Sequence, residues 1–165
     1  MKNILFLLLL AATTLQLTAQ KDTTDNYVKK FLSIPAIKLN IVPDSLEYTN
    51  EHLKKGNPFV LVFFNPDCDH CQKETKELLA YKEELKAIQI LMVSSAPYSE
   101  IKDFYKSFGL SSMPNIKLGH DAKYKLSAIY KLSTFPSIFV YDQNGNLAKA
   151  FTGNIGVPAI LDAVK

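Results

Sequence analysis

The chain has 165 residues, of which 47% are hydrophobic and 21% are charged, a balance typical of a globular protein. The formal net charge is +3, and all 19 basic residues are lysines. Nucleic-acid binders rely on arginine for bidentate and stacked contacts, and these lysines are scattered rather than grouped in a stripe. The composition therefore argues against nucleic-acid binding.

The N-terminal segment has the pattern of a secretory signal peptide. Lys2 precedes an uncharged apolar run from Ile4 to Ala12, and a polar stretch follows that ends at the small residue Ala19. The run is shorter than the roughly 20 residues that cross a bilayer, so a cleaved peptide is favoured over a permanent anchor. We therefore predict export to the periplasm or cell envelope.

The remaining length suits one domain with its own core, and the sequence shows no internal repeat or low-complexity tract. We predict a signal peptide over residues 1–19, a polar leader over residues 20–34 and a single domain over residues 35–165.

The domain begins with short extended segments. Ile37 to Ile41 alternates apolar and polar residues, which predicts a strand with one buried face. After a turn, Leu46 to Tyr48 is placed to pair back as a hairpin. A short helix through Leu53 is expected next, capped by Thr49 or Asn50.

A strongly apolar strand and a helix follow. Phe59 to Phe64 is a continuous apolar run, typical of a strand buried on both faces, and it stops at Asn65-Pro66. After Pro66 the apolar spacing becomes helical up to Ile88. Ile90 to Val93 is a second buried strand.

The second half of the domain alternates helices and strands. In chain order we predict a helix, a short strand, a helix, two strands joined by a tight turn, and a closing helix, over Ser99–Phe108, Ile116–Leu118, Asp121–Tyr130, Ser137–Tyr141, Leu147–Phe151 and Ala159–Val164. Because helices between strands imply parallel pairing and hairpins add antiparallel members, the predicted fold class is α/β, with a mixed central sheet flanked by helices and an N-terminal hairpin.

The two cysteines of the chain, Cys68 and Cys71, are separated by Asp69 and His70 and lie where the buried strand gives way to the helix. Residues three apart on a helix lie close together, so the two sulfurs are able to form a short disulfide. The first cysteine lies at the helix N-terminus, where free N–H groups and the helix dipole favour a thiolate. The second lies further in and is the expected resolving thiol.

Two other roles for the cysteine pair are less well supported. A structural disulfide that encloses two residues removes little entropy from the unfolded chain. A structural zinc site needs four ligands, and His52, His70 and His120 form no familiar spacing with the cysteines. We therefore predict a thiol-disulfide oxidoreductase without a metal, whose redox group is the Cys68–Cys71 disulfide itself and which needs no other cofactor.

Charged neighbours are expected to tune the first thiol. His70 lowers a thiol pKa when it is positive, which stabilises the reduced form and makes the disulfide more oxidising. Asp67 and Asp69 act in the opposite direction. The sequence therefore predicts an intermediate reduction potential, above the value of about −270 mV for thioredoxin.

These features, with Pro35 to Leu39, Lys55 to Val62 and Tyr141 to Gly145, resemble the TlpA/ResA-like branch of exported thioredoxin-fold proteins from about Pro35 to Lys165. Phe135-Pro136-Ser137 resembles the strand of that family that opens with a cis proline. The resemblance implies that Pro136 faces the redox pair, and that Phe135 shapes the groove where its backbone pairs with substrate.

The resemblance also implies a role for Glu74, which would move the proton of Cys71 during exchange; the other interpretation is a solvent-exposed glutamate on a helix. The chain departs from its relatives in three ways. Asp67 replaces a common tryptophan, no proline separates the cysteines, and Val62 replaces the buried acid of thioredoxin.

The predicted function is exchange of disulfides with protein substrates, most consistent with a reductant, and the resemblance implies a membrane thiol carrier as electron donor. Three alternatives remain open. One is a thiol peroxidase, although the chain lacks arginine and has Asn65 where peroxidases have threonine. The second is a copper-binding module that uses Cys68, Cys71 and His70 or His120. The third is a folding-assistance or binding domain in which the cysteines turn over slowly or not at all. The sequence leaves the oligomeric state undecided.

Overall fold

The computed structural model describes residues 31–165, which form one unit. The predicted signal peptide, and the predicted leader as far as residue 30, lie outside the described residues. In chain order the elements are β1 (Lys38–Ile41), β2 (Glu47–Thr49), the 3₁₀ turn η1 (Asn50–His52), β3 (Phe59–Phe63), α3 (Asp69–Ala80), α4 (Lys82–Leu85), β4 (Gln89–Ser94), α5 (Tyr98–Ser107), η2 (Leu110–Ser112), β5 (Ile116–His120), α6 (Ser127–Tyr130), β6 (Ser137–Tyr141), β7 (Leu147–Thr152) and α7 (Val157–Ala163).

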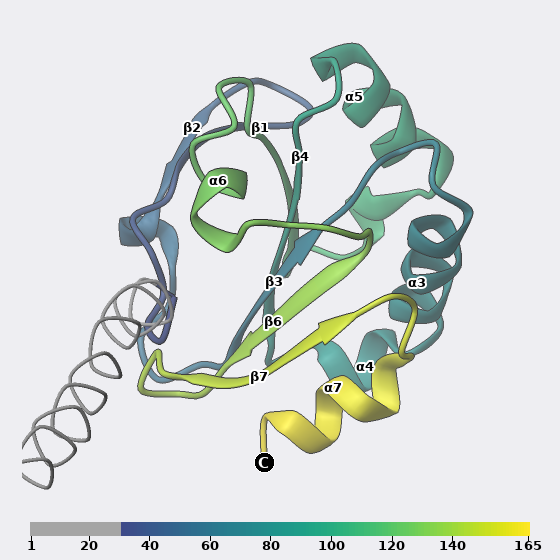
Figure 1. Cartoon of the computed structure of the whole chain (residues 1–165). Coiled ribbons are helices and arrows are strands. Elements are labelled where there is room, and N and C mark those ends of the chain that lie inside the picture. The colour runs from purple at the N-terminus through teal and green to yellow at the C-terminus, as the bar shows by residue number, and fades with distance from the viewer. Residues whose placement is uncertain (1–30) are drawn as a thin grey trace, which may run out of the picture. The chain divides into compact units, whose positions relative to one another are not determined.

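The strands form one seven-stranded sheet in the order β2-β1-β5-β4-β3-β6-β7 (Figure 1). β3, β4 and β5 are parallel neighbours, whereas β6 and β7 add antiparallel strands on one side. On the other side, the β1–β2 hairpin joins the sheet through antiparallel pairing of β1 with β5. The predicted α/β class, mixed sheet and N-terminal hairpin are confirmed.

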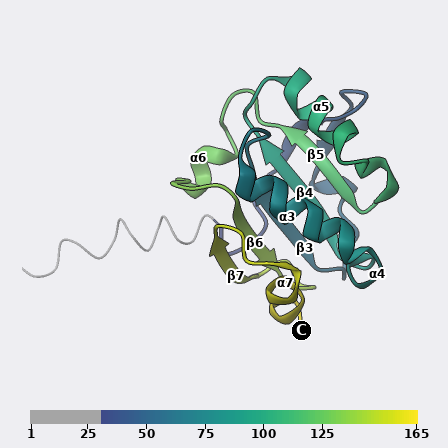
Figure 2. The same ribbon diagram turned by 90° about the vertical axis from the view of Figure 1, so that its right-hand side faces the viewer.

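Alternate residues of the central strands build two separate cores. Val60 and Val62 of β3 face the side of the sheet that α3, α5 and α7 cover, and they pack there with apolar residues such as Leu78 and Ile101 (Figure 2). Because side chains alternate along a strand, Phe59, Leu61 and Phe63 face the opposite side. This alternation explains why β3 has a continuous apolar sequence.

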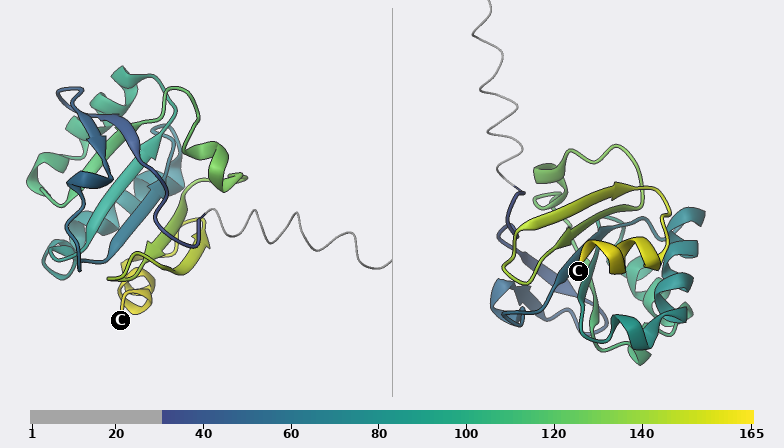
Figure 3. Two further views of the ribbon diagram at one scale, coloured as in Figure 1. Left: turned by 90° about the vertical axis from the view of Figure 1, so that its left-hand side faces the viewer. Right: turned by 90° about the horizontal axis from the view of Figure 1, so that it is seen from below.

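The second core is rich in aromatic residues, and no long helix of the described residues covers it (Figure 3, left). Tyr130 of α6 packs on Phe63 and Phe139, with ring centroids 4.9 and 4.3 Å away. Its hydroxyl lies 2.6 Å from the hydroxyl of Tyr141, which donates to the carbonyl of Phe31. The buried hydroxyls are therefore paired, and α6 is fixed to the sheet.

The prediction of a helix over Asp121–Tyr130 is wrong for most of its length, because only Ser127–Tyr130 is helical. The carboxylate of Asp121 accepts hydrogen bonds from the backbone N–H groups of Lys125 and Ser127 and from the Ser127 hydroxyl. These bonds hold a loop before the single helical turn, and Tyr124 in that loop has a φ of +53°.

Two smaller predictions also need correction. The short helix expected up to Leu53 is only the 3₁₀ turn η1, which Thr49 caps. The long helical pattern after Pro66 is divided at Tyr81 into α3 and α4. Within residues 31–165, no helix has the length and apolar character required to span a membrane.

Candidate active site

Strand pairing brings three loops together at one end of the sheet. Phe63, the last residue of β3, pairs with Ser137, the first residue of β6, so the chain that leaves β3 runs beside the chain that enters β6. Ser137 also pairs with Thr152 at the end of β7. The cysteine motif, the Phe135–Pro136 segment and the loop over residues 153–156 therefore meet at this end.

Cys68 is the N-cap residue of α3 and is partly exposed. Its carbonyl accepts a hydrogen bond from Gln72 N–H at 3.0 Å, which starts the helix. Its Sγ lies 3.7 Å from the carbonyl oxygen of Phe135, toward which the thiol donates. The sulfur is thus at the helix mouth, where unsatisfied N–H groups favour negative charge.

Cys71 lies one turn further along α3 and is only 1% exposed. Burial raises the pKa of the Cys71 thiol to about 12, and both the contact with Cys68 and the charge of Glu74 act in the same direction. A backbone hydrogen bond involving Asn65 acts in the opposite direction without cancelling the shift. The two cysteines, both free thiols here, therefore differ sharply in access to solvent.

The peptide bond between Phe135 and Pro136 is cis, as the resemblance implied. Pro136 is buried and its carbonyl accepts a hydrogen bond from Gly153 N–H at 2.8 Å, whereas the Phe135 side chain is 41% exposed. This arrangement fixes the backbone of the segment while leaving an aromatic ring at the surface beside Cys68.

Glu74 is 1% exposed, so the interpretation as a solvent-exposed helix glutamate is wrong. Its Oε2 accepts three hydrogen bonds: from Asn154 Nδ2 at 2.5 Å, from Ile155 N–H at 3.1 Å and from Gly156 N–H at 3.3 Å. Its Oε1 is buried and has no hydrogen-bond partner among the described residues. One oxygen is held in place, and the other remains available to an adjacent group.

Three of the residues that build the site were not predicted from the sequence. Asn154, Ile155 and Gly156 hold Glu74 from a loop about 80 positions further along the chain, and no spacing pattern links them to it. Gly156 has a φ of +80°, and a Cβ there would lie 2.8 Å from an oxygen of Glu77. The closely spaced glycines of this loop were the available sequence signal.

Asn65 is a further unpredicted contributor. Its Oδ1 accepts a hydrogen bond from Asp67 N–H at 3.0 Å, and its carbonyl accepts one from Cys68 N–H at 3.1 Å. These bonds form an Asx-type turn that orients the chain before the helix. The Asn65-Pro66-Asp67 sequence has the composition of such a turn.

The remaining predicted residues surround the mouth of α3. The side chains of Asp67, Asp69 and His70 are all exposed, and none forms an ion pair with another described residue. In the part of the chain that the structure describes, no group of three or more His, Cys, Asp or Glu side chains is placed to hold a metal ion. The copper-binding alternative therefore gains no support from this region.

Comparison with known proteins identifies the family. The model of the thioredoxin-like domain matches residues 47–165, well over half of the chain. No curated protein sequence matches. Among solved structures, a secreted disulfide oxidoreductase of Mycobacterium tuberculosis, homologous to DsbE of E. coli, is 18% identical, with a TM-score of 0.64 over 78% of this chain and 96% of that one.

Two other structures are informative. The exposed lipoprotein thioredoxin of Streptococcus pneumoniae strain TIGR4 is 25% identical, with a TM-score of 0.62 over 77% of this chain and 96% of that one. The peroxidoxin BcpB of M. tuberculosis is 14% identical, with a TM-score of 0.66 over 79% and 92% of the two chains. Family model, fold and cysteine geometry agree with the predicted resemblance: the chain belongs to the thioredoxin-like family and has the Cys-x-x-Cys pair of its thiol-disulfide oxidoreductases.

Proposed function

We propose that this chain is an exported thiol-disulfide oxidoreductase that reduces disulfides in protein substrates through Cys68 and Cys71. The observation that carries the proposal is the contrast between the two thiols at the mouth of α3. Cys68 is accessible beside a cis proline, whereas Cys71 is buried behind it with a pKa raised to about 12. An accessible attacking thiol and a protected resolving thiol suit a two-step exchange.

In the first step, the Cys68 thiolate attacks one sulfur of a substrate disulfide. The substrate S–S bond breaks, its second sulfur leaves as a thiolate and takes up a proton, and a mixed disulfide with Cys68 forms. In the second step, the Cys71 thiolate attacks Cys68 Sγ, and the remaining substrate sulfur leaves and is protonated. Two electrons and two protons pass to the substrate, and the Cys68–Cys71 disulfide remains.

Glu74 is proposed to accept the proton of Cys71 in the second step. A thiol whose pKa is raised to about 12 is rarely ionised at neutral pH, so resolution needs a base beside it. Glu74 follows Cys71 by three positions on α3, so the two side chains lie on the same face of the helix, and both are buried. Glu74 Oε1 has no described partner and is the candidate acceptor, while Oε2 is held by the loop over residues 154–156.

Substrate binding is proposed to use the Phe135–Pro136 segment, whose backbone lies beside Cys68 and is held by the hydrogen bond from Gly153 N–H to the Pro136 carbonyl. An extended substrate segment that pairs with this backbone would bring its disulfide onto the helix mouth. Proton exchange at the thiols and backbone pairing require no cofactor beyond the cysteine pair.

Export and the direction of exchange are part of the same proposal. The N-terminal pattern of the sequence and the description of two similar structures as a secreted disulfide oxidoreductase and an exposed lipoprotein thioredoxin support a location outside the cytoplasm. A reductant in an oxidising compartment must be reduced again after each cycle. We propose a membrane thiol carrier as the electron donor.

The decisive experiment replaces Cys68 with serine. With dithiothreitol as the reductant, the wild-type protein is expected to accelerate the reduction of insulin, and Cys68→Ser is expected to show only the dithiothreitol background. Ser111→Ala, an exposed change in η2, is the control for handling and folding. Insulin reduction that persists in Cys68→Ser would refute the assignment.

A thiol peroxidase is the second candidate, because the peroxidoxin shares the fold at a TM-score of 0.66. Peroxide activation needs a positive hydrogen-bond donor beside the reactive cysteine, yet the chain has no arginine, and Asn65 stands three residues before Cys68. We expect catalytic amounts of the reduced protein to consume hydrogen peroxide no faster than Cys68→Ser does.

A further inference from the structure

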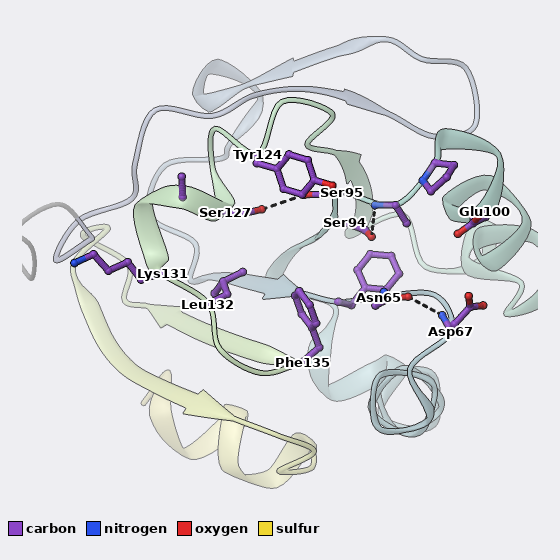
Figure 4. Close-up of a pocket in the computed structure, with 14 residues that line it drawn as sticks. Asn65, Asp67, Ser94, Ser95, Glu100, Tyr124, Ser127, Lys131, Leu132 and Phe135 are labelled. Atoms are coloured by element: carbon purple, nitrogen blue, oxygen red, sulfur yellow. Dashed lines mark hydrogen bonds between the residues drawn. The ribbon is translucent and has the colours of Figure 1, made fainter.

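A cavity of about 580 Å³ adjoins the candidate active site, with Asp67 and Phe135 among its lining residues (Figure 4). Two neighbours of the reactive sulfur contribute to its lining: Asp67, which precedes Cys68, and Phe135, whose carbonyl lies 3.7 Å from Cys68 Sγ. Its size falls within the range of binding pockets for ligands and side chains. A polypeptide whose sulfur reaches Cys68 is therefore able to place a neighbouring residue in this cavity.

Two segments form the walls of the cavity. One is the β4–α5 junction, Ser94 to Pro97, and the other runs from Tyr124 through α6 to Phe135. The Ser95 and Ser127 hydroxyls lie 3.3 Å apart and link the two walls. Asp121, which is buried, accepts hydrogen bonds from Ser127 and donates its backbone N–H to Ser94, so the second wall is anchored to the sheet.

The lining is suited to a large apolar side chain. Four large hydrophobic side chains are exposed among the described residues, and two of them, Tyr124 at 62% and Phe135 at 41%, line this cavity. Phe64 and Leu132 add apolar surface. Tyr124 and Lys131 also have left-handed backbone angles, with φ of +53° and +43°, a conformation that needs support from the surrounding structure.

Charge is distributed unevenly along the cavity. The carboxylates of Asp67 and Glu100 lie on the same side, whereas Lys131 lies at the far end with its amine directed away from the other lining residues (Figure 4). Neither carboxylate forms an ion pair with a described residue. The side of the cavity near the reactive sulfur is therefore negative, although the whole chain is positive.

We propose that this cavity is a specificity subsite for client proteins, and that it favours segments with a large apolar residue and a lysine or arginine beside the target cysteine. The apolar side chain enters between Tyr124, Leu132 and Phe135, and the cation faces Asp67 and Glu100. This inference rests on the proposed function, because it assigns the substrate class of the same site.

The test measures binding without redox chemistry. The chain has no tryptophan, so Tyr124→Trp places a single fluorescent reporter on the cavity rim while keeping an aromatic side chain there. The probes are peptides with serine in place of the target cysteine, flanked by Phe-Lys, Phe-Glu or Ala-Lys. Each pair is placed before the serine in one peptide and after it in another, so that both chain directions are sampled.

The Phe-Lys peptide is expected to bind at least about tenfold more tightly than the Ala-Lys peptide, because a buried phenylalanine loses contact with water. It is expected to bind about threefold more tightly than the Phe-Glu peptide, a difference typical of exposed charge pairs. Glu100→Gln in the reporter background should remove much of the threefold preference. Glu84→Gln, the same change on exposed α4, should leave it intact.

Filling the cavity provides the second arm. Ala128 lines the cavity, so Ala128→Leu is expected to abolish the preference for phenylalanine, whereas Ala80→Leu at the exposed end of α3 is the matched control. Equal binding of all the peptides, or a phenylalanine preference that survives Ala128→Leu, would overturn the proposal. Insulin reduction measured in parallel separates the two failures. If the Tyr124→Trp protein reduces insulin but shows no peptide preference, only the subsite is refuted. If the wild-type protein does not reduce insulin, the proposed function is refuted.

Discussion

The N-terminal part of α3 has a solvent-exposed side, called here the open side, and a buried side, called the closed side. Each side has one cysteine and one carboxyl group, but their surroundings differ. On the open side, Asp67 and Cys68 meet solvent, the Phe135 backbone and a cavity. On the closed side, Cys71 and Glu74 are each 1% exposed. A single helical turn is enough to separate the two thiols, because residue 68 caps the helix while residue 71 faces the core. Because both residues are cysteines, the difference between their expected roles comes from burial and not from residue type.

The largest expected effect comes from removing the closed-side thiol alone. In Cys71→Ser, Cys68 still attacks the substrate disulfide, but no second thiol of the protein resolves the mixed disulfide. Turnover should therefore stop, and covalent protein–substrate species should accumulate. Non-reducing electrophoresis and mass spectrometry after mixing with oxidised substrate would detect them. The double variant lacking both cysteines should form none, and its absence of adducts identifies Cys68 as the linked residue.

The next largest effect concerns the buried carboxylate. Glu74→Gln keeps the size of the side chain and an oxygen for the loop donors but removes the base, so the resolving step is expected to slow about 100-fold, while the attack by Cys68 changes little. Rapid-quench measurement of mixed-disulfide formation and decay separates the two steps. Glu77→Gln, on the same helix one turn later, is the control. Equal slowing of both steps would indicate a loss of structure instead of a lost proton acceptor.

The raised pKa of Cys71 also predicts a pH dependence of stability. Burial disfavours the ionised thiol, so the unfolded chain loses this proton at about pH 8.5 and the folded chain only near 12. The stabilisation is complete below the unfolded pKa and falls by about 1.4 kcal/mol per pH unit above it. Between pH 7 and 10, the free energy of unfolding of reduced wild type should fall by about 2 kcal/mol more than that of Cys71→Ala.

Urea unfolding of reduced wild type and of Cys71→Ala at pH 7 and pH 10 measures this difference. The contributions of titrating lysines and tyrosines to the pH dependence cancel, because both proteins contain these residues. Identical pH dependence in the two proteins would mean that Cys71 is not protected from water in solution.

The smallest expected effect is on the open side. His70 is exposed and forms no ion pair with a described residue, so solvent and salt screen its charge. His70→Ala is expected to move the reduction potential by less than about 30 mV, which corresponds to about 1.4 kcal/mol for a two-electron couple. Equilibration with glutathione buffers measures the potential. A shift of twice that size would show that the exposed side controls the redox poise.

The sequence was most informative where a residue's role depends on its near neighbours. β3 and β6 were predicted almost to their ends because both faces are buried, which produces continuous apolar runs. The position of Cys68 at the start of a helix follows from Asn65-Pro66 and from the change in apolar spacing. The cis bond before Pro136 followed from the family resemblance, not from the local sequence.

Features that depend on distant segments were not predictable. Glu74 has the sequence surroundings of a surface residue, with Lys73 and Lys76 nearby, and it is buried only because the loop before α7 folds over it. Asp121 was expected to cap a long helix, but the helix starts only at Ser127 with Leu126 as its N-cap, and the bonds of Asp121 hold the loop that precedes it. The cavity near Cys68 is built by three segments, residues 64–67, 94–100 and 124–135, which are far apart in the sequence, so no local pattern indicates it.

The residues that hold Glu74 lie about 80 positions after it in the sequence, so its carboxyl group is satisfied only when the segment that leads into α7 has folded onto α3. Without that contact the protein would have both thiols, but the carboxyl group beside the resolving one would lack its hydrogen-bond donors. Competence of Cys71 therefore depends on the docking of a distant segment. A protein in which this loop is loosened is expected to attack substrate normally through Cys68 and to release it slowly.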